Sequence, residues 1–165
     1  MPVIVGFDPG ITGAACAVRI DPFGYNLEFI ELFDLPSQPD GTKRQIHVEV
    51  LGNWLEKIEP DLAIIENVQP MMGKGAASQA MVGANSFRFG MACGAIRATV
   101  AAYGIPYKLV VPQVWKRSFN LRGSDKEASR KKAIAELPAA EPFLKRRLDH
   151  NRADACLLAL WGARQ

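Results

Sequence analysis

Several features are scarce in this sequence of 165 residues, and each absence excludes a class of protein. The three cysteines lie far apart without CxxC spacing, which argues against a disulfide framework or a zinc site and favours reduced, buried thiols. No apolar run approaches the roughly 20 residues of a membrane-spanning helix, and no basic leader precedes the first predicted strand. Neither a repeat nor a low-complexity linker divides the chain. We therefore expect a single cytoplasmic domain over residues 1–165, with no membrane partner.

Basic residues are concentrated in one part of the chain. The formal net charge is only +3, but residues 108–152 hold 12 of the 20 lysines and arginines, against five acids. A basic surface of this kind suits a partner with a phosphate backbone. A solvated basic face is the alternative interpretation, and charge alone does not separate the two.

Two apolar segments end in a carboxylate. Residues 3–7 are rich in β-branched side chains and predict a buried strand, with Asp8 at its end and Pro9-Gly10 turning the chain away. Residues 62–66 repeat the pattern and end at Glu66. Because an unpaired buried charge is very costly, each carboxylate needs a cation, either a metal ion or a basic side chain. Together, the two strand ends predict the floor of a metal site.

The remaining elements predict an α/β fold. We expect strands at 3–7, 13–20, 26–35, 62–66 and 105–111, a polar loop at 36–42, and helices at 44–58, 78–103, 126–137 and from about 149 to 163, with a short helix or turn from Pro112. Strands interleaved with helices in this order indicate a mixed sheet with helices on its faces.

Three glycines fall near one face of the long predicted helix. Gly83, Gly90 and Gly94 each cost about 1 kcal/mol relative to alanine in a helix interior. We expect them to allow close packing against the sheet or another helix; a homodimer contact is the alternative.

The final helix begins with polar residues in an otherwise apolar segment. His150 and Asn151 precede Asp154 by four and three residues, so either can share its face. Asp149 is better placed as the N-cap, although it is also a candidate ligand. Carboxylates from two strand ends and one helix, with His150 beside them, supply the hard oxygen ligands that two Mg²⁺ ions require.

Four short motifs occur in a recognisable order. They are Phe7-Asp-Pro-Gly10 followed by Thr12-Gly13, Ile64-Ile-Glu66, Gly123-Ser-Asp-Lys126 before a basic helix, and His150 with Ala153-Asp-Ala155. In order and spacing, over nearly the whole chain, they resemble the RuvC-type Holliday junction resolvases of the ribonuclease H-like superfamily. Pro112-xx-Trp115-Lys116 is similar to the phage-borne branch, which would place the protein in the cytoplasm of the host.

This resemblance implies a fold and a reaction. The fold is a five-stranded mixed sheet with the long helix at a homodimer interface. The reaction is Mg²⁺-dependent cleavage of two symmetry-related strands of a four-way DNA junction, with Mn²⁺ expected to substitute. Carried over by position, Asp8, Glu66 and Asp154 are metal ligands, with His150 and Asp149 as further candidates. One ion would activate the attacking water, and a second would stabilise the leaving 3′ oxygen.

Further residues are expected to contact DNA. Lys126 is the candidate for the scissile or adjacent phosphate and is counted with the catalytic residues Asp8, Glu66, His150 and Asp154. The expected DNA-binding residues are Met71, Lys74, Lys116, Arg122, Lys126, Arg130, Lys131 and Lys132.

Two positions depart from the family pattern. Asn151 stands where relatives carry Asp or His, so His150 or Asp149 must complete the metal site, or the fourth ligand is weaker. Gln69 stands where relatives often carry an aromatic residue that stacks at the junction centre, which leaves Met71 or Met72 for that role.

Other functions use the same residues. A ribonuclease H-type enzyme or a general branched-DNA nuclease would need the same acids, and a catalytically weak junction-binding protein would keep the basic surface. An actin-like ATPase would bind phosphate at Asp8-Pro-Gly10, but 165 residues provide only one such half.

Overall fold

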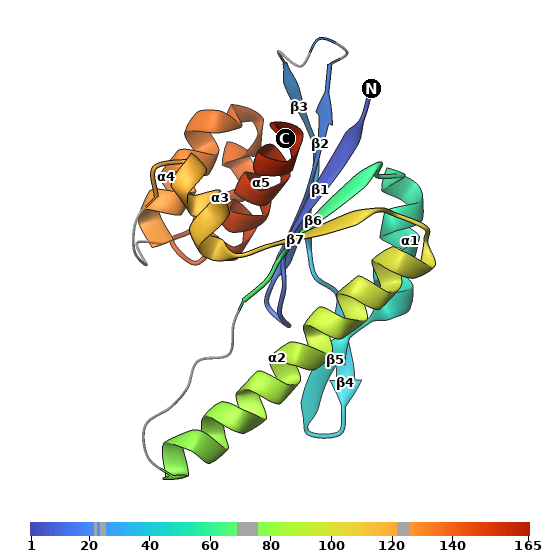
Figure 1. Ribbon diagram of the computed structural model, residues 1–165, viewed down its shortest axis with the longest axis vertical. Coiled ribbons are helices and arrows are strands. Elements are labelled where there is room, and N and C mark those ends of the chain that lie inside the picture. Colours follow the sequence, from blue (N-terminus) through green and yellow to red (C-terminus); the bar gives the residue numbers. More distant parts are fainter. Residues whose placement is uncertain (22, 24–25, 69–75, 122–125) are drawn as a thin grey trace.

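A five-stranded mixed sheet lies at the centre of the computed structural model, which describes residues 1–21, 23, 26–68, 76–121 and 126–165 (Figure 1). The sheet has the order β3-β2-β1-β6-β7. Its strands are β1 (Val3–Asp8), β2 (Ala14–Ile20), β3 (Leu27–Asp34), β6 (Leu62–Glu66) and β7 (Tyr107–Val110). β1 is antiparallel to β2 and parallel to β6, and β6 is parallel to β7. The carboxyl ends of β1 and β6, which carry Asp8 and Glu66, therefore lie at the same edge of the sheet.

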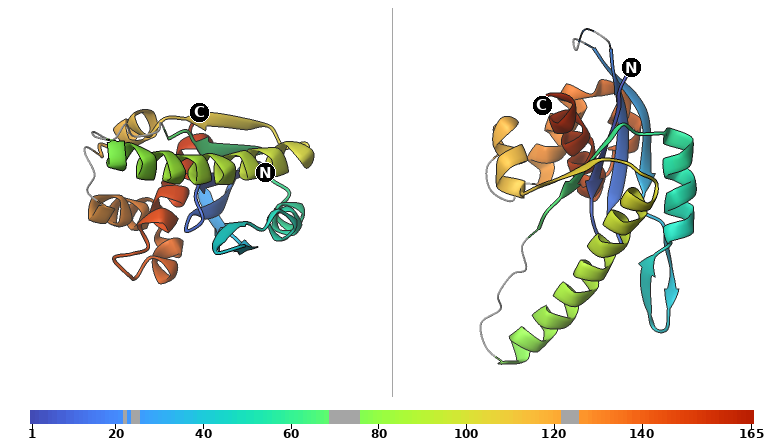
Figure 2. Two further views of the ribbon diagram at one scale, coloured as in Figure 1. Left: turned by 90° about the horizontal axis from the view of Figure 1, so that it is seen from below. Right: turned by 45° about the vertical axis from the view of Figure 1, so that its right-hand side comes forward.

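Helices cover both faces of the sheet, as the sequence predicts. The helices are α1 (Val48–Ile58), α2 (Ala76–Ala102), α3 (Pro112–Ser118), α4 (Lys126–Glu136) and α5 (His150–Ala163), with a 3₁₀ helix at Pro138–Phe143. Figures 1 and 2 show α3, α4 and α5 on one face and α1 with the C-terminal half of α2 on the other. Alternate residues of β1 serve the two cores, Ile4 facing α5 and Val5 facing α1.

Helix α5 approaches β1 most closely at Gly6. A Cβ atom at this position would lie 2.3 Å from the backbone nitrogen of Ala159 and 2.4 Å from the carbonyl oxygen of Ala155. Both alanines are fully buried, so small residues on strand and helix allow this contact. The contact fixes the helix that carries Asp154 directly on the strand that carries Asp8.

The prediction for residues 36–46 is wrong. In place of a loop and the first turn of a helix, β4 (Ser37–Asp40) and β5 (Lys43–Ile46) form an antiparallel hairpin, and α1 begins at Val48. Gly41 in the two-residue connection has a φ of 58°, the left-handed conformation that tight hairpin turns require. Ile46 fits the spacing of either element, which explains the misplaced helix start.

The glycines of α2 do not pack within the chain. Gly83, Gly90 and Gly94 are exposed, and a Cβ atom at any of them would meet no described atom within 4 Å. The prediction that they pack against the sheet is therefore wrong, and their face of α2 is open. The N-terminal half of this helix projects beyond the sheet (Figure 1).

The structure also bears on the cysteines and on membrane-spanning helices. Cys16, Cys93 and Cys156 are buried and free, which confirms the prediction of reduced thiols. Within the described ranges, no helix is both long enough and apolar enough to cross a membrane.

Candidate functional site

Glu66 is the most deeply buried of the predicted site residues on the sheet. It ends β6, is 6% exposed, and accepts a hydrogen bond of 2.9 Å from the indole Nε1–H of Trp115. Trp115 is brought there by α3, which begins at Pro112 immediately after β7, the strand paired with β6. A fully buried indole that donates to a carboxylate fixes the orientation of that carboxylate.

The charges around Glu66 come from two other elements. Burial raises the pKa of Glu66 above its ordinary value; the Trp115 hydrogen bond opposes this rise, the charge on Asp154 adds to it, and the charge on Lys116 lowers it. Asp154 on α5 is therefore close enough to repel Glu66. A divalent cation bound between these carboxylates would relieve the repulsion.

The charges on both Asp8 and Glu66 act on the thiol of Cys93 on α2. Burial raises the pKa of the Cys93 thiol, the charge on Arg97 lowers it, and the charges on Asp8 and Glu66 raise it. The three predicted carboxylates thus share one electrostatic neighbourhood, which includes the sheet edge, the start of α5 and one face of α2.

The donor set fits a hard divalent cation. Asp8, Glu66 and Asp154 are carboxylates from three elements, and carboxylate oxygens are the ligands that Mg²⁺ prefers. Among the described side chains, no three of His, Cys, Asp and Glu converge closely enough to form a finished metal site. A bound ion would therefore have to draw the carboxylates closer together.

Asp149, a predicted candidate ligand, is held by hydrogen bonds within the turn that precedes α5. It is 3% exposed, and its Oδ2 accepts the backbone N–H of Arg146 at 2.8 Å. Its Oδ1 accepts Nε and Nη2 of Arg146 at 3.0 and 2.8 Å. Burial raises the pKa of Asp149, but the Arg146 bonds and the charge on Arg152 outweigh burial and lower it. Asp149 occupies the predicted N-cap position of α5, but it orders the preceding turn and makes no side-chain cap bond.

Asn151 connects α5 to the turn after β1. Its Nδ2 donates to the carbonyl oxygen of Thr12 at 2.8 Å. Since Thr12 follows Asp8 by four residues, the bond ties the start of the helix that carries Asp154 to the turn next to Asp8. His150 is the first residue of α5 and is half-buried.

The predicted DNA-binding residues separate into distinct environments. Lys116 lies beside the site, with its Nζ 5.2 Å from the centre of the Trp115 ring and its charge acting on Glu66. The guanidinium of Arg130 pairs with Glu127 and donates from Nη1 to the carbonyl oxygen of Leu144 at 2.7 Å. Lys132 pairs with Glu136 at 2.6 Å, whereas Lys131 is exposed.

Several predicted residues cannot be placed. Gln69, Met71, Met72, Lys74 and Arg122 lie outside the described residues. Lys126 begins α4, but its side chain is also outside the described part.

Three residues at the site were missed from the sequence. Trp115 entered only as part of a motif, yet it is the hydrogen-bond donor to Glu66. Cys93 and Arg97 lie one turn apart on α2, and Nη2 of Arg97 donates to Oδ1 of Asn67, the residue after Glu66, at 3.2 Å. The parallel pairing of β6 and β7 could have indicated that Trp115, which soon follows β7, lies near Glu66 at the end of β6. No local sequence signal indicates that α2 packs beside Glu66.

We expect Glu66→Gln to stabilise the metal-free protein at neutral pH. Because the pKa of Glu66 is raised on folding, the folded state binds more protons than the unfolded state between the two pKa values. The free energy of unfolding therefore falls as pH rises through that window. Gln stays neutral and can still accept the Trp115 hydrogen bond. Thermal unfolding in a chelator should show a higher Tm for the variant at pH 7 and a difference that closes in acid.

The matched control is Glu56→Gln on α1, where the carboxylate is exposed. It should change the pH dependence of Tm very little. Added Mg²⁺ should raise the Tm of the wild type more than that of Glu66→Gln. Identical curves for all three proteins would contradict both the burial of the Glu66 charge and its role toward a cation.

The arrangement of strands and helices is that of the ribonuclease H-like fold, a mixed five-stranded sheet flanked by helices. Among solved structures the chain is similar to Holliday junction resolvases. Thermus thermophilus RuvC in complex with a Holliday junction substrate matches with a TM-score of 0.66 and 18% identity, covering 98% of this chain and 92% of that one.

Two further resolvases share the fold. The yeast mitochondrial Holliday junction resolvase Ydc2 has a TM-score of 0.63 and 16% identity, covering 98% of this chain and 77% of its own. Fowlpox virus resolvase, in complex with Holliday junction DNA, has a TM-score of 0.53 and 17% identity, with 98% and 97% covered. No family model and no curated protein sequence matches the chain. These likenesses therefore establish the fold.

Proposed function

We propose that this protein is a divalent-metal-dependent endonuclease that resolves four-way DNA junctions by paired symmetric nicks. The observation that carries the proposal is the shared electrostatic neighbourhood of Asp8, Glu66 and Asp154, within the fold of the junction resolvases. Two of the similar structures are complexes with Holliday junction DNA, which supports branched DNA as the partner.

Residues around the three carboxylates hold them in place and balance their negative charge. Asp8, Glu66 and Asp154 would hold Mg²⁺ or Mn²⁺, whose chemistry is to acidify a water molecule and neutralise charge on the phosphate. Trp115 holds the Glu66 carboxylate in place by its hydrogen bond. Lys116 supplies a positive charge beside Glu66, where a phosphate would enter. The Asn151 bond to Thr12 keeps α5 in register with the turn next to Asp8.

The proposed reaction is tested with purified protein, Mg²⁺ and three end-labelled substrates. We expect paired, symmetric nicks in a four-way junction, no nicks in linear duplex and none in an RNA–DNA hybrid. Cleavage of the hybrid regardless of branching would assign the chain to the ribonuclease H class. Cleavage of forks and flaps at equal rates would indicate a general branched-DNA nuclease, and binding without cleavage would indicate a junction-binding protein.

Paired nicks require two active sites, and we propose that a second copy binds along the open face of α2. A two-fold symmetric dimer matches the symmetry of the junction. Gly90 and Gly94 are exposed and leave this face without side chains, so the backbone of another helix could approach closely.

Gly94→Glu should therefore convert a dimer to a monomer in sedimentation velocity. The reason is that the new carboxylate would be buried against the partner helix without a cation. We expect the monomer to lose concerted paired cleavage. Asn85→Glu, an exposed position on the opposite side of α2, is the control and should remain dimeric. An unchanged sedimentation coefficient for Gly94→Glu would place the dimer interface elsewhere.

A further inference from the structure

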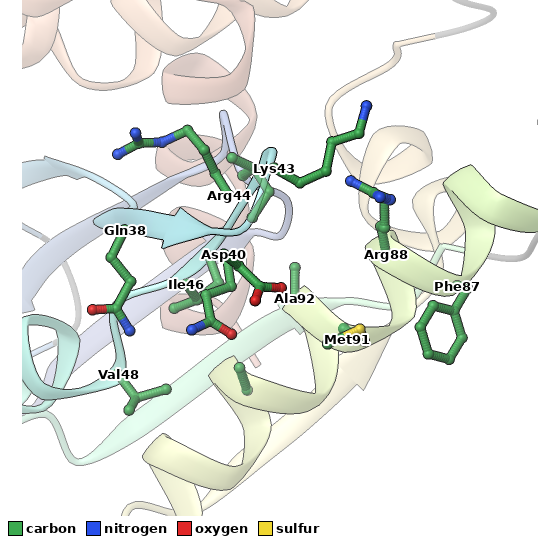
Figure 3. A pocket seen from close by; sticks show the side chains of 13 residues that line it. Gln38, Asp40, Lys43, Arg44, Ile46, Val48, Phe87, Arg88, Met91 and Ala92 are labelled. Carbon is green, nitrogen blue, oxygen red and sulfur yellow. The ribbon is translucent and has the colours of Figure 1, made fainter.

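A groove separates the β4–β5 hairpin from α2 and contains none of the residues proposed for catalysis (Figure 3). Its volume is about 400 Å³, within the range of small-ligand sites. The floor is apolar and is formed by Ile11, Ile46, Met91, Ala92 and Ala95.

One lining residue of the groove belongs to the turn that follows Asp8. Ile11, at its floor, belongs to the turn after β1 and follows Asp8 by three residues. The same turn touches α2, because a Cβ atom at Gly10 would lie 3.9 Å from the ring of Phe89. A nucleic-acid strand that passes Asp8 and continues over this turn would enter the groove.

The two walls contribute positive charge at the opening. Lys43 comes from β5 and Arg88 from α2, and Figure 3 shows both side chains extended along the same side of the groove. Within the described part of the chain, no salt bridge involves either residue. Arg44, by contrast, donates from Nε to the hydroxyl of Ser37 at 2.8 Å. Lys43 and Arg88 are therefore available to an anion.

The hairpin also contributes polar side chains to the lining of the groove. Gln38 and Gln45 are partners across the β4–β5 pair, and Asp40 is the partner of Lys43. All of these side chains line the groove. Amides and a carboxylate provide the donors and acceptors that match the edge of a nucleobase, and Gln is suited to bidentate contact with adenine.

We propose that the groove takes up one unpaired nucleotide from the centre of branched DNA. The base would lie on the apolar floor with its edge toward Gln38 and Gln45, and its phosphate would lie between Lys43 and Arg88. Apolar or aromatic support combined with a basic rim is the usual chemistry of single-strand binding. The inference rests on the proposed function, because a branch point supplies an unstacked base at low cost.

A second copy of this chain is the competing occupant. Two copies paired groove to groove, unlike the dimer proposed on the glycine face of α2, would bring Lys43 and Arg88 of one copy against those of the other. Repulsion between like charges disfavours that arrangement. DNA complements the charge of the rim, so we commit to the nucleotide.

The test uses junctions with 2-aminopurine at each position around the branch point, bound to Asp8→Asn protein so that no cleavage occurs. We expect one position to show increased fluorescence on binding, because its base has left the stack. Adding Lys43→Gln and Arg88→Gln should abolish that increase, weaken binding five- to tenfold and reduce the slope of log affinity against log salt by about 1.5. Gln38→Ala with Gln45→Ala should abolish the increase with less than a threefold loss of affinity.

Arg19→Gln is the control, because Arg19 is a cation at the opposite end of the sheet. Its backbone lies across from that of Val3, the first residue of β1. It should leave fluorescence and salt dependence unchanged. Junction binding and fluorescence that are normal in both double variants would overturn the groove alone. Failure of the parent protein to bind any junction would overturn the proposed function together with the groove. If the variant with Lys43→Gln and Arg88→Gln sedimented differently from its parent but kept the fluorescence increase, the groove would be assigned to a second copy and the proposal would be overturned.

Discussion

Asp8→Asn should abolish junction cleavage while junction binding stays the same or becomes tighter. Asp8 ends β1 beside Glu66 on the parallel strand β6, so it stands where a shared cation would be held. Asn has the same shape but no charge and is a poor ligand for a hard cation. We expect the cleavage rate to fall by at least about 10²–10³-fold, the range for removing one preorganised electrostatic group from an active site.

The measurement is single-turnover cleavage of a labelled junction, with binding measured separately in Ca²⁺. Asp34→Asn provides the control, because Asp34 ends β3 at the same edge of the sheet but is exposed and paired with Arg152. It should keep its rate within about threefold of the wild type, as expected for loss of an exposed ion pair. Cleavage by Asp8→Asn at the wild-type rate would refute the proposed site.

Gly6→Ala should destabilise the folded protein more than any surface change. The added methyl would lie 2.3 and 2.4 Å from backbone atoms of α5, and neither the strand nor the helix can avoid it by a side-chain rotation. Overpacking of a core typically costs 1–3 kcal/mol, and we expect about 3 kcal/mol or more here because backbone must move. Urea unfolding followed by circular dichroism would measure the loss.

Gly83→Ala is the matched substitution at an open position. Among the described residues a Cβ there meets nothing within 4 Å, so alanine should stabilise the helix by about 0.5–1 kcal/mol. The two Gly→Ala changes thus have opposite expected signs. If Gly6→Ala unfolded at the wild-type midpoint, the close contact between β1 and α5 would be wrong.

The parts of the fold that the sequence predicts are those with strong local signals. The apolar runs before Asp8 and Glu66 predicted β1 and β6, and Pro112 predicted the start of α3. The β4–β5 hairpin was missed because its short strands have little apolar alternation, although Pro39-Asp40-Gly41 is a turn signal.

The sequence predicted the acidic residues of the site, but it did not predict the residues that form hydrogen bonds around them. The bond from Trp115 to Glu66 joins residues that are 49 apart in the chain, and the bond from Asn151 to Thr12 joins residues 139 apart. No local pattern encodes such pairs. The bond from Arg130 to Leu144 has the same cause, since its acceptor is set by how α4 packs against the following turn. Likewise, glycine spacing on α2 could not distinguish a packed face from an open one.

The contact between Gly6 and α5 also has a consequence for synthesis on the ribosome. The first strand to emerge depends for one of its covers on α5, which is translated after almost every other described residue. Until His150–Ala163 leaves the exit tunnel, the apolar side of the sheet lies open, and Asp8 and Glu66 lack Asp154. A nascent chain that lacks α5 therefore exposes apolar surface that favours aggregation, and under the proposed function it would lack one of the three carboxylates needed to hold the metal.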